Sequence, residues 1–135
     1  MTCGPKEVLK YDYALLKLDG RVARRAYVQL GLEYIKQEEQ VGLTGYPGAF
    51  CSDEAATQSF LWKAKAHEPH GFTLNHKLTT FEGNSGSPLL VRREKSIVAI
   101  AIHKGSPKGE TINCGRLITQ DLMANLLMWE KEMTS

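Results

Sequence analysis

The chain has 135 residues, 42% of them hydrophobic, and its 17 basic and 15 acidic residues give a net charge of +2. This length is sufficient for one domain with its own hydrophobic core. Because neither sign of charge forms a block, the sequence predicts no nucleic-acid partner and no membrane-binding surface, and no apolar run approaches the roughly 18 residues of a membrane span.

The cysteines carry little information about the fold. Cys3, Cys51 and Cys114 are too few and too scattered for a disulfide framework or a zinc site. One disulfide could form and would leave one thiol over, but the sequence does not decide the pair. No metal and no cofactor is expected. Residues 1–6 contain no apolar segment of signal-peptide length, and the compartment of the protein stays open.

Short apolar runs alternate with turn residues in the first part of the chain. Residues 8–18 are apolar and aromatic enough to predict a strand, which residues 19–20 (Asp-Gly) would end. Residues 21–40 are charged and irregular, so we expect a connecting segment with a short strand. Residues 41–50 indicate a short strand that runs into a Tyr-Pro-Gly turn.

Two hairpins are expected in the middle of the chain. Residues 57–66 alternate between polar and apolar side chains, as in a half-buried strand. A turn at residues 69–71 leads into residues 72–78, which we expect to pair with that strand. Residues 88–91 and 97–102 predict a second hairpin around a charged tip.

The hydrophobic period changes at the C-terminus. Residues 111–118 predict the last strand, Thr119 is a suitable helix N-cap, and Asp121 would lie favourably in the first turn. The apolar residues that follow at helical spacing are Leu122, Met123, Leu126, Leu127 and Trp129. About six strands followed by one amphipathic helix predict an all-β fold, an antiparallel barrel with a C-terminal α-helix packed outside it.

Ser85 is the candidate nucleophile. It lies in residues 79–88 (Thr-Thr-Phe-Glu-Gly-Asn-Ser-Gly-Ser-Pro), among small turn-forming residues directly before an apolar run. A serine hydroxyl attacks only when a base takes its proton, and the resulting oxyanion needs hydrogen-bond donors beside it. By themselves these residues fit an ordinary turn equally well. Asp12 is similarly open: it could face water at a strand edge, or it could orient a histidine.

Four motifs in a fixed order favour the interpretation of Ser85 as a nucleophile over that of an ordinary turn. They are residues 12–18 (Asp-Tyr-Ala-Leu-Leu-Lys-Leu), 44–48 (Thr-Gly-Tyr-Pro-Gly), 83–88 (Gly-Asn-Ser-Gly-Ser-Pro) and 100–103 (Ile-Ala-Ile-His). With these motifs the chain resembles the chymotrypsin-fold (trypsin-like) serine proteases, and it is most similar to their glutamyl endopeptidase branch.

The resemblance implies a partial, N-terminally truncated protease domain. Residues 1–36 would be the end of the first barrel and a linker. Residues 37–119 would form the second, six-stranded barrel, and residues 120–133 the C-terminal helix. The implied activity is that of a serine endopeptidase, a hydrolase that cleaves a polypeptide substrate through an acyl-enzyme at Ser85.

The resemblance also assigns roles to individual residues. Asp12 would fix the tautomer of the catalytic histidine and stabilise its imidazolium. The backbone amides of Gly83 and Ser85 would form the oxyanion hole. Each of these roles depends on the arrangement of the folded chain, because the residues come from separate segments.

Substrate specificity is implied by a second group of residues. Thr80 and His103 match the pair that binds an acidic substrate side chain in the glutamyl branch, with Thr79 and Lys104 as further substrate-binding candidates. A hydroxyl and an imidazole can together hold a carboxylate, although Thr80 and His103 also fit ordinary strand positions. Glu82 would repel an acidic group at close range, and Lys104 could offset it.

The general base is missing from its expected place. The order His, Asp, Ser requires a histidine before Asp12, but the eleven residues that precede Asp12 contain none. The histidines of the chain are His67, His70, His76 and His103. Two alternatives follow: part of a serine endopeptidase, with a first barrel or a partner chain covering its cleft, or a catalytically inactive protease-like module that binds peptides or a partner.

Overall fold

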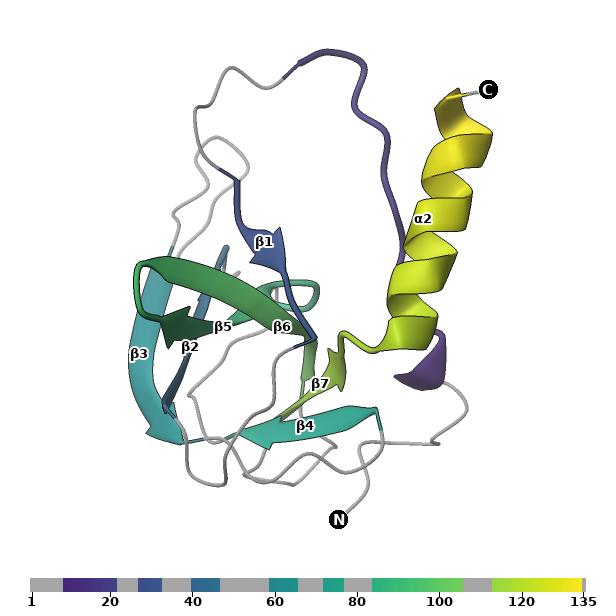
Figure 1. The fold of residues 1–135 in the computed structure, drawn as a ribbon. Coiled ribbons are helices and arrows are strands. Elements are labelled where there is room, and N and C mark those ends of the chain that lie inside the picture. Colours follow the sequence, from purple (N-terminus) through teal and green to yellow (C-terminus); the bar gives the residue numbers. More distant parts are fainter. Residues whose placement is uncertain are drawn as a thin grey trace.

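A computed structural model of the chain describes residues 9–21, 27–32, 40–46, 59–65 (backbone only), 72–76, 84–105 and 113–134. A curved sheet forms the body of the molecule, and one long helix stands beside it (Figure 1). The strands are β1 (Gln29–Leu30), β2 (Gln40–Gly45), β3 (Ser59–Lys65), β4 (Thr73–His76), β5 (Pro88–Arg93), β6 (Ser96–Gly105) and β7 (Asn113–Leu117), and the helix is α2 (Gln120–Thr134).

Six strands follow one antiparallel path in the order β3-β2-β5-β6-β7-β4. The short strand β1 is attached to this path by parallel pairing with β6, where Gln29 lies opposite Val98. The architecture is therefore mostly antiparallel β-sheet with one C-terminal helix, which confirms the predicted fold class.

The two predicted hairpins have different outcomes. The first is wrong, because β3 pairs with β2 and β4 pairs with β7, which places β3 and β4 at opposite ends of the strand order. Alternating polarity identifies a strand but not its partner. The second hairpin is confirmed: β5 and β6 pair directly, and their two-residue tip contains Glu94 with a φ of 36°, a left-handed conformation that tight hairpin turns require.

The predicted strand at residues 8–18 is also wrong in detail. Leu9 and Lys10 form a helical turn, and residues 12–18, here called the extended segment, belong to no strand of the sheet. The extended segment instead runs beside α2 (Figure 1). Apolar composition indicated an extended backbone correctly, but a strand also needs a neighbouring strand in register.

Side chains attach the extended segment to α2. The Tyr13 hydroxyl accepts a hydrogen bond of 2.6 Å from Asn125 Nδ2, and the ring centroids of Tyr13 and Trp129 are 5.6 Å apart. Farther along, Lys17 Nζ donates to the Met133 carbonyl at 3.0 Å. The position of Asp12 therefore depends on contacts with the helix.

Arg116 of β7 fixes the start of the same segment. Only 2% of this residue is exposed, and its Nε donates to the Lys10 carbonyl at 2.9 Å. Its guanidinium lies 5.5 Å from the ring centroid of Tyr13 and 5.2 Å from that of Phe72. A buried guanidinium is costly unless it donates hydrogen bonds. These contacts tie the chain immediately before Asp12 to the sheet.

The core has two parts. One lies within the curved sheet and contains Val41, Leu43, Leu74, Leu89, Val91, Val98, Ile100 and Ala101. The other joins the sheet to α2 and contains Leu90, Ala99, Ile118 and Leu122. The Thr119 cap is confirmed, since the Leu122 amide donates to Thr119 Oγ1 at 3.3 Å, but Leu127 is 54% exposed and lies off the predicted buried face.

Cys114 is buried and disulfide-bonded, and its partner lies outside the described residues. Within the described ranges, no helix is long and apolar enough to cross a membrane. In the same ranges, no three histidine, cysteine or acidic side chains gather as they would around a metal ion.

Candidate active site

Ser85 lies at the second position of a tight turn. The Ser87 amide donates to the Asn84 carbonyl at 3.0 Å, and Gly86 has a φ of 88°, which together define a type II turn with glycine at its third position. Both backbone groups of His103 in β6 bind this turn. The Gly86 amide donates to the His103 carbonyl, and the His103 amide donates to the Ser87 carbonyl, each at 2.8 Å. Ser85 is thus held where the central strands β5 and β6 meet the turn.

Gly45 supports this turn from behind. A Cβ atom on Gly45 would lie 2.0 Å from Ser87 Oγ and 3.0 Å from Asn84 Oδ1, so only glycine fits beside the turn. Asn84 is completely buried, and its side-chain amide has no hydrogen-bond partner among the described residues. The segments that contain Gly45 and Ser85, two of the four motifs, therefore meet in space.

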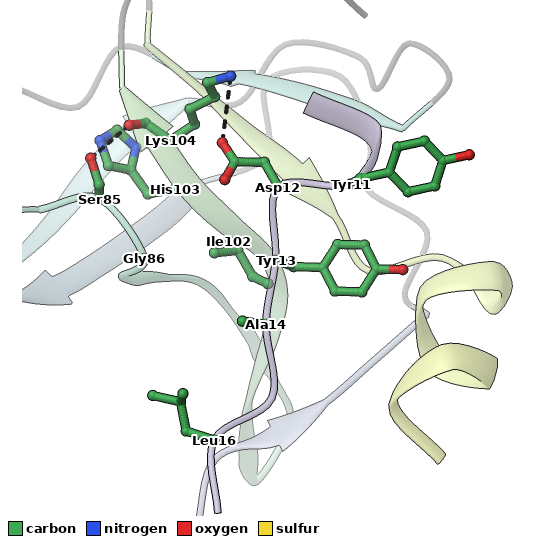
Figure 2. A pocket seen from close by; sticks show the side chains of 10 residues that line it. All are labelled: Tyr11, Asp12, Tyr13, Ala14, Leu16, Ser85, Gly86, Ile102, His103 and Lys104. Atoms are coloured by element: carbon green, nitrogen blue, oxygen red, sulfur yellow. Dashed lines mark hydrogen bonds and ion pairs between the residues drawn. The ribbon is translucent and has the colours of Figure 1, made fainter. Parts of the chain in front are cut away.

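Asp12 and Ser85 line one pocket with a volume of about 630 Å³. Asp12 comes from the extended segment and Ser85 from the turn before β5, and Lys104 of β6 lies between them (Figure 2). The pocket is lined by Tyr11, Asp12, Tyr13, Ala14, Leu16, Ser85, Gly86, Ile102, His103 and Lys104. The predicted nucleophile and the predicted acid thus share a site, although they are far apart in the sequence.

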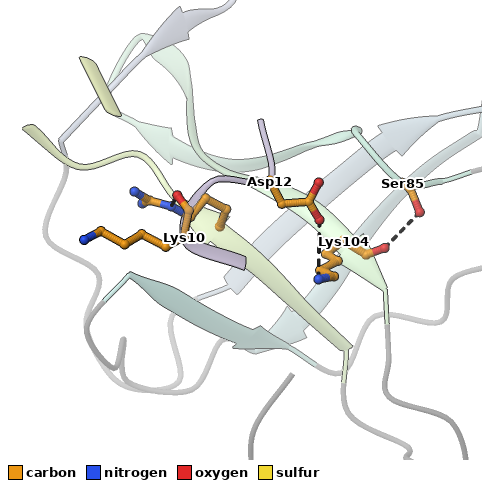
Figure 3. Close-up of polar contacts among 5 residues, drawn as sticks. Lys10, Asp12, Ser85 and Lys104 are labelled. Carbon is orange, nitrogen blue, oxygen red and sulfur yellow. Dashed lines mark hydrogen bonds and ion pairs between the residues drawn. The ribbon is translucent and has the colours of Figure 1, made fainter. Parts of the chain in front are cut away.

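Lys104 contacts both of these residues (Figure 3). Its ammonium lies 3.4 Å from Asp12 Oδ2, and its backbone carbonyl accepts a hydrogen bond of 2.8 Å from Ser85 Oγ. A peptide carbonyl is too weak a base to remove the proton of a serine. Ser85 is therefore held in place by this bond without being activated.

His103 forms the buried side of the site together with His76. Only 3% of His103 and none of His76 is exposed, and His76 Nε2 lies 3.1 Å from His103 Nδ1. Burial lowers the pKa of His103 from 6.5 to about 4. Burial, and then the charge of His103, lower the pKa of His76 to about 3. Both imidazoles are consequently neutral at pH 7, and one N–H is shared between them.

His76 was not among the residues selected from the sequence. The sequence feature that could have identified it is its position on the apolar face of the strand that also carries Leu74, because a buried imidazole there needs a hydrogen-bond partner. Neither His76 nor His103 hydrogen-bonds to Ser85 or Asp12 in the structure. The missing base is therefore not supplied by a histidine of the described segments in this arrangement.

The described residues include only part of the predicted site. It brings Ser85, Asp12, His103 and Lys104 together around one pocket. The remaining site residues lie outside the described residues, so their roles stay predictions: Thr79, Thr80, Glu82 and Gly83. Lys104 was selected as a substrate-binding residue, and its amine pairs with Asp12.

Comparison with known proteins identifies the fold. No protein-family model and no curated protein matches the chain. Among solved structures, the chain is similar to a Glu endopeptidase in complex with MPD, with a TM-score of 0.65 and 20% identity, over 78% of this chain and 47% of the endopeptidase.

Two structures of tobacco etch virus protease are similar as well. The catalytically active protease with product gives a TM-score of 0.54 over 76% of this chain and 42% of the protease, at 20% identity. The catalytically inactive protease with substrate gives a TM-score of 0.53 over 76% of this chain and 45% of the protease, also at 20% identity. The chain has the chymotrypsin-like protease fold and spans less than half the length of these proteases.

Proposed function

We propose that this chain supplies the nucleophile and the orienting acid of a serine endopeptidase. The observation that carries the proposal is that Ser85 and Asp12 line one pocket in a chain with the chymotrypsin-like protease fold. Fold likeness alone would not carry it, because one fold hosts many functions. The turn at Gly86 and the close approach of Gly45 add support, since both keep Ser85 at the rim of the pocket.

In the proposed reaction, a base removes the proton from Ser85 Oγ while the oxygen attacks the scissile carbonyl carbon. The backbone amides of Gly83 and Ser85 stabilise the oxyanion that forms. The base then protonates the leaving amine, the peptide C–N bond breaks, and water hydrolyses the resulting acyl-enzyme. Asp12 stabilises the base when it carries the extra proton.

The base comes from outside the described segments. Its place is the pocket between Asp12 and Ser85, which at about 630 Å³ exceeds the volume of one imidazole ring several-fold. A further barrel, in the same polypeptide or in a partner chain, would cover this pocket. The uncovered face of the extended segment supports this proposal, because Leu16 is 80% and Leu18 is 62% exposed, and exposed apolar patches mark interfaces.

The proposed substrate is a polypeptide with an acidic residue before the scissile bond. His103 lines the pocket, and its Nδ1 is engaged with His76, which leaves Nε2 for a ligand. A neutral imidazole can donate one hydrogen bond to a carboxylate, and the negative charge of that carboxylate would favour protonation of His103. Thr80 is the second proposed contact.

The experiment uses the complete 135-residue chain. A fluorophosphonate probe is added with and without free imidazole, which can take the place of the missing base. Ser85 Oγ attacks phosphorus, fluoride leaves, and imidazole accepts the serine proton. We expect labelling that rises with imidazole concentration, disappears in Ser85→Ala and persists in Ser96→Ala, a matched control on the exposed β5–β6 hairpin.

The alternative function is a catalytically inactive module that binds peptides or a partner. The observation that favours it is that Asp12 and Ser85 are both engaged by Lys104 rather than by a base. The same experiment separates the two. Absence of Ser85-dependent labelling, in a chain that circular dichroism shows to be folded, would overturn the enzyme proposal and favour the binding module.

A further inference from the structure

We propose that Lys104 restrains the candidate active site: its ammonium neutralises the Asp12 carboxylate and so weakens the support that Asp12 gives to a base beside Ser85. This inference rests on the proposed function, since it concerns the regulation of the same site. It does not follow from the fold, because it depends on the side chain that this sequence places at position 104.

The charges around the pocket motivate the inference. Among the described residues that line it, the charged ones are Asp12 and Lys104, one of each sign. His103, the imidazole in the lining, is neutral because burial lowers its pKa to about 4. When a bound imidazole accepts the Ser85 proton, it adds one positive charge. The pocket then carries a net positive charge with Lys104 present, and none if Lys104 is replaced by a neutral residue.

The geometry makes this charge effective. A base that reaches both Ser85 and Asp12 must lie within hydrogen-bond distance of the carboxylate whose Oδ2 is 3.4 Å from Lys104 Nζ. The imidazolium and the ammonium would then share one carboxylate, and two like charges a few ångströms apart repel each other. Lys104 thus opposes the protonated state of the base on which the reaction depends.

An irregularity in β6 places Lys104 beside Asp12 and Ser85. The pairing of β6 with β7 shifts register between His103 and Gly105, and Gly105 has a φ of 141°, a conformation that favours glycine. Such bulges redirect side chains next to functional sites. At this bulge the Lys104 carbonyl accepts the hydrogen bond from Ser85, and the Lys104 ammonium pairs with Asp12. A substitution at position 104 therefore removes the ammonium and retains the backbone carbonyl.

The restraint is weak enough to be relieved. The Lys104 side chain is 28% and the Asp12 side chain 50% exposed, and ion pairs this exposed are screened by salt and contribute little to stability. Removing the ammonium should therefore leave the chain folded. It follows that the effect of Lys104 can be measured separately from its effect on folding.

The test compares the complete wild-type chain with Lys104→Met, Lys104→Arg and a matched control, Lys95→Met, which removes the same charge from the exposed tip between β5 and β6. Imidazole is titrated in two measurements: the rate of Ser85 labelling by a fluorophosphonate, and the NMR shifts that report imidazole binding. We expect Lys104→Met to lower the half-saturating imidazole concentration about two- to fivefold, the effect typical of a partly exposed ion pair. Lys104→Arg and Lys95→Met should resemble the wild type.

Salt provides a second readout that a purely structural role would not change. Raising sodium chloride should narrow the difference in half-saturating imidazole concentration between the wild type and Lys104→Met, because it screens the charge of the Lys104 ammonium. An unchanged or higher half-saturating concentration in Lys104→Met, by NMR and by labelling, would overturn the inference.

The two proposals fail separately. If Lys104→Met binds imidazole more tightly by NMR but neither protein is labelled at Ser85, the restraint stands and the proposed function fails. If the wild type is labelled at Ser85 and Lys104→Met behaves identically, the proposed function stands and the restraint is refuted. If neither is labelled and the NMR titrations coincide, both are refuted.

Discussion

His76 and His103 lie side by side in the interior, with His76 Nε2 3.1 Å from His103 Nδ1. One imidazole comes from β4 and the other from β6, which β7 separates in the sheet. His103 also lines the pocket that contains Ser85, and its backbone holds the serine turn. The protonation of this buried pair is thus connected to the geometry of the candidate site.

The first prediction concerns pH. Folding lowers the pKa of His103 from 6.5 to about 4 and that of His76 to about 3, so the unfolded chain binds more protons below pH 6.5. The free energy of unfolding should therefore decrease as the pH falls from 6.5 towards 4, by up to about 1.4 kcal/mol per pH unit for each histidine. Urea unfolding at several pH values measures this slope. His76→Gln should reduce it, and equal stability at pH 7 and pH 5 would contradict the assignment.

Gly45→Ala should disturb the serine turn. The new Cβ would lie 2.0 Å from Ser87 Oγ and close to Asn84, so the turn must shift. We expect a loss of about 1–3 kcal/mol in the free energy of unfolding, the usual cost of overpacking, and slower labelling of Ser85. Gly20→Ala is the matched control, because nothing lies within 4 Å of a Cβ at that position. Equal stability of the two variants would show that the turn does not pack on Gly45.

Tyr13→Phe tests how the extended segment is attached. It removes the 2.6 Å hydrogen bond from Asn125 and leaves the ring contact with Trp129. The free energy of unfolding should fall by about 0.5–1.5 kcal/mol. Tyr27→Phe, at a residue 68% exposed, should have no effect. If both variants unfold at the same urea concentration as the wild type, the hydroxyl does not hold the segment on α2.

Thr119→Ala tests the start of α2. The Leu122 amide would lose its acceptor at Thr119 Oγ1, and a lost N-cap costs about 1 kcal/mol. Thermal unfolding followed by circular dichroism measures the change. Thr119→Ser retains the hydroxyl and should restore most of the stability; a serine variant as unstable as the alanine variant would argue against the cap.

Local features of the fold could be predicted from the sequence, whereas pairings between distant segments could not. The β5–β6 hairpin and the Thr119 cap join neighbours in the chain, so turn chemistry and hydrophobic period were sufficient. The partners of β3 and β4 lie in other parts of the sequence, and alternation does not encode them.

The site followed the same rule. The proximity of Asp12 and Ser85 was expected from the family resemblance, not from periodicity. The contact of Lys104 with both residues depends on the bulge between His103 and Gly105, and the His76–His103 contact depends on the register of three strands. The apolar strand face that carries His76 indicates a buried imidazole, but the sequence does not identify the partner in either contact.

Ser85 is proposed to be a nucleophile that a base can activate. The most direct measurement is peptide mapping by mass spectrometry of the chain after treatment with a fluorophosphonate and imidazole. We expect one adduct, located on Ser85, whose rate of formation rises with imidazole concentration and which is absent from Ser85→Ala. An adduct on other residues, or an unmodified Ser85 in the folded chain at saturating imidazole, would contradict it.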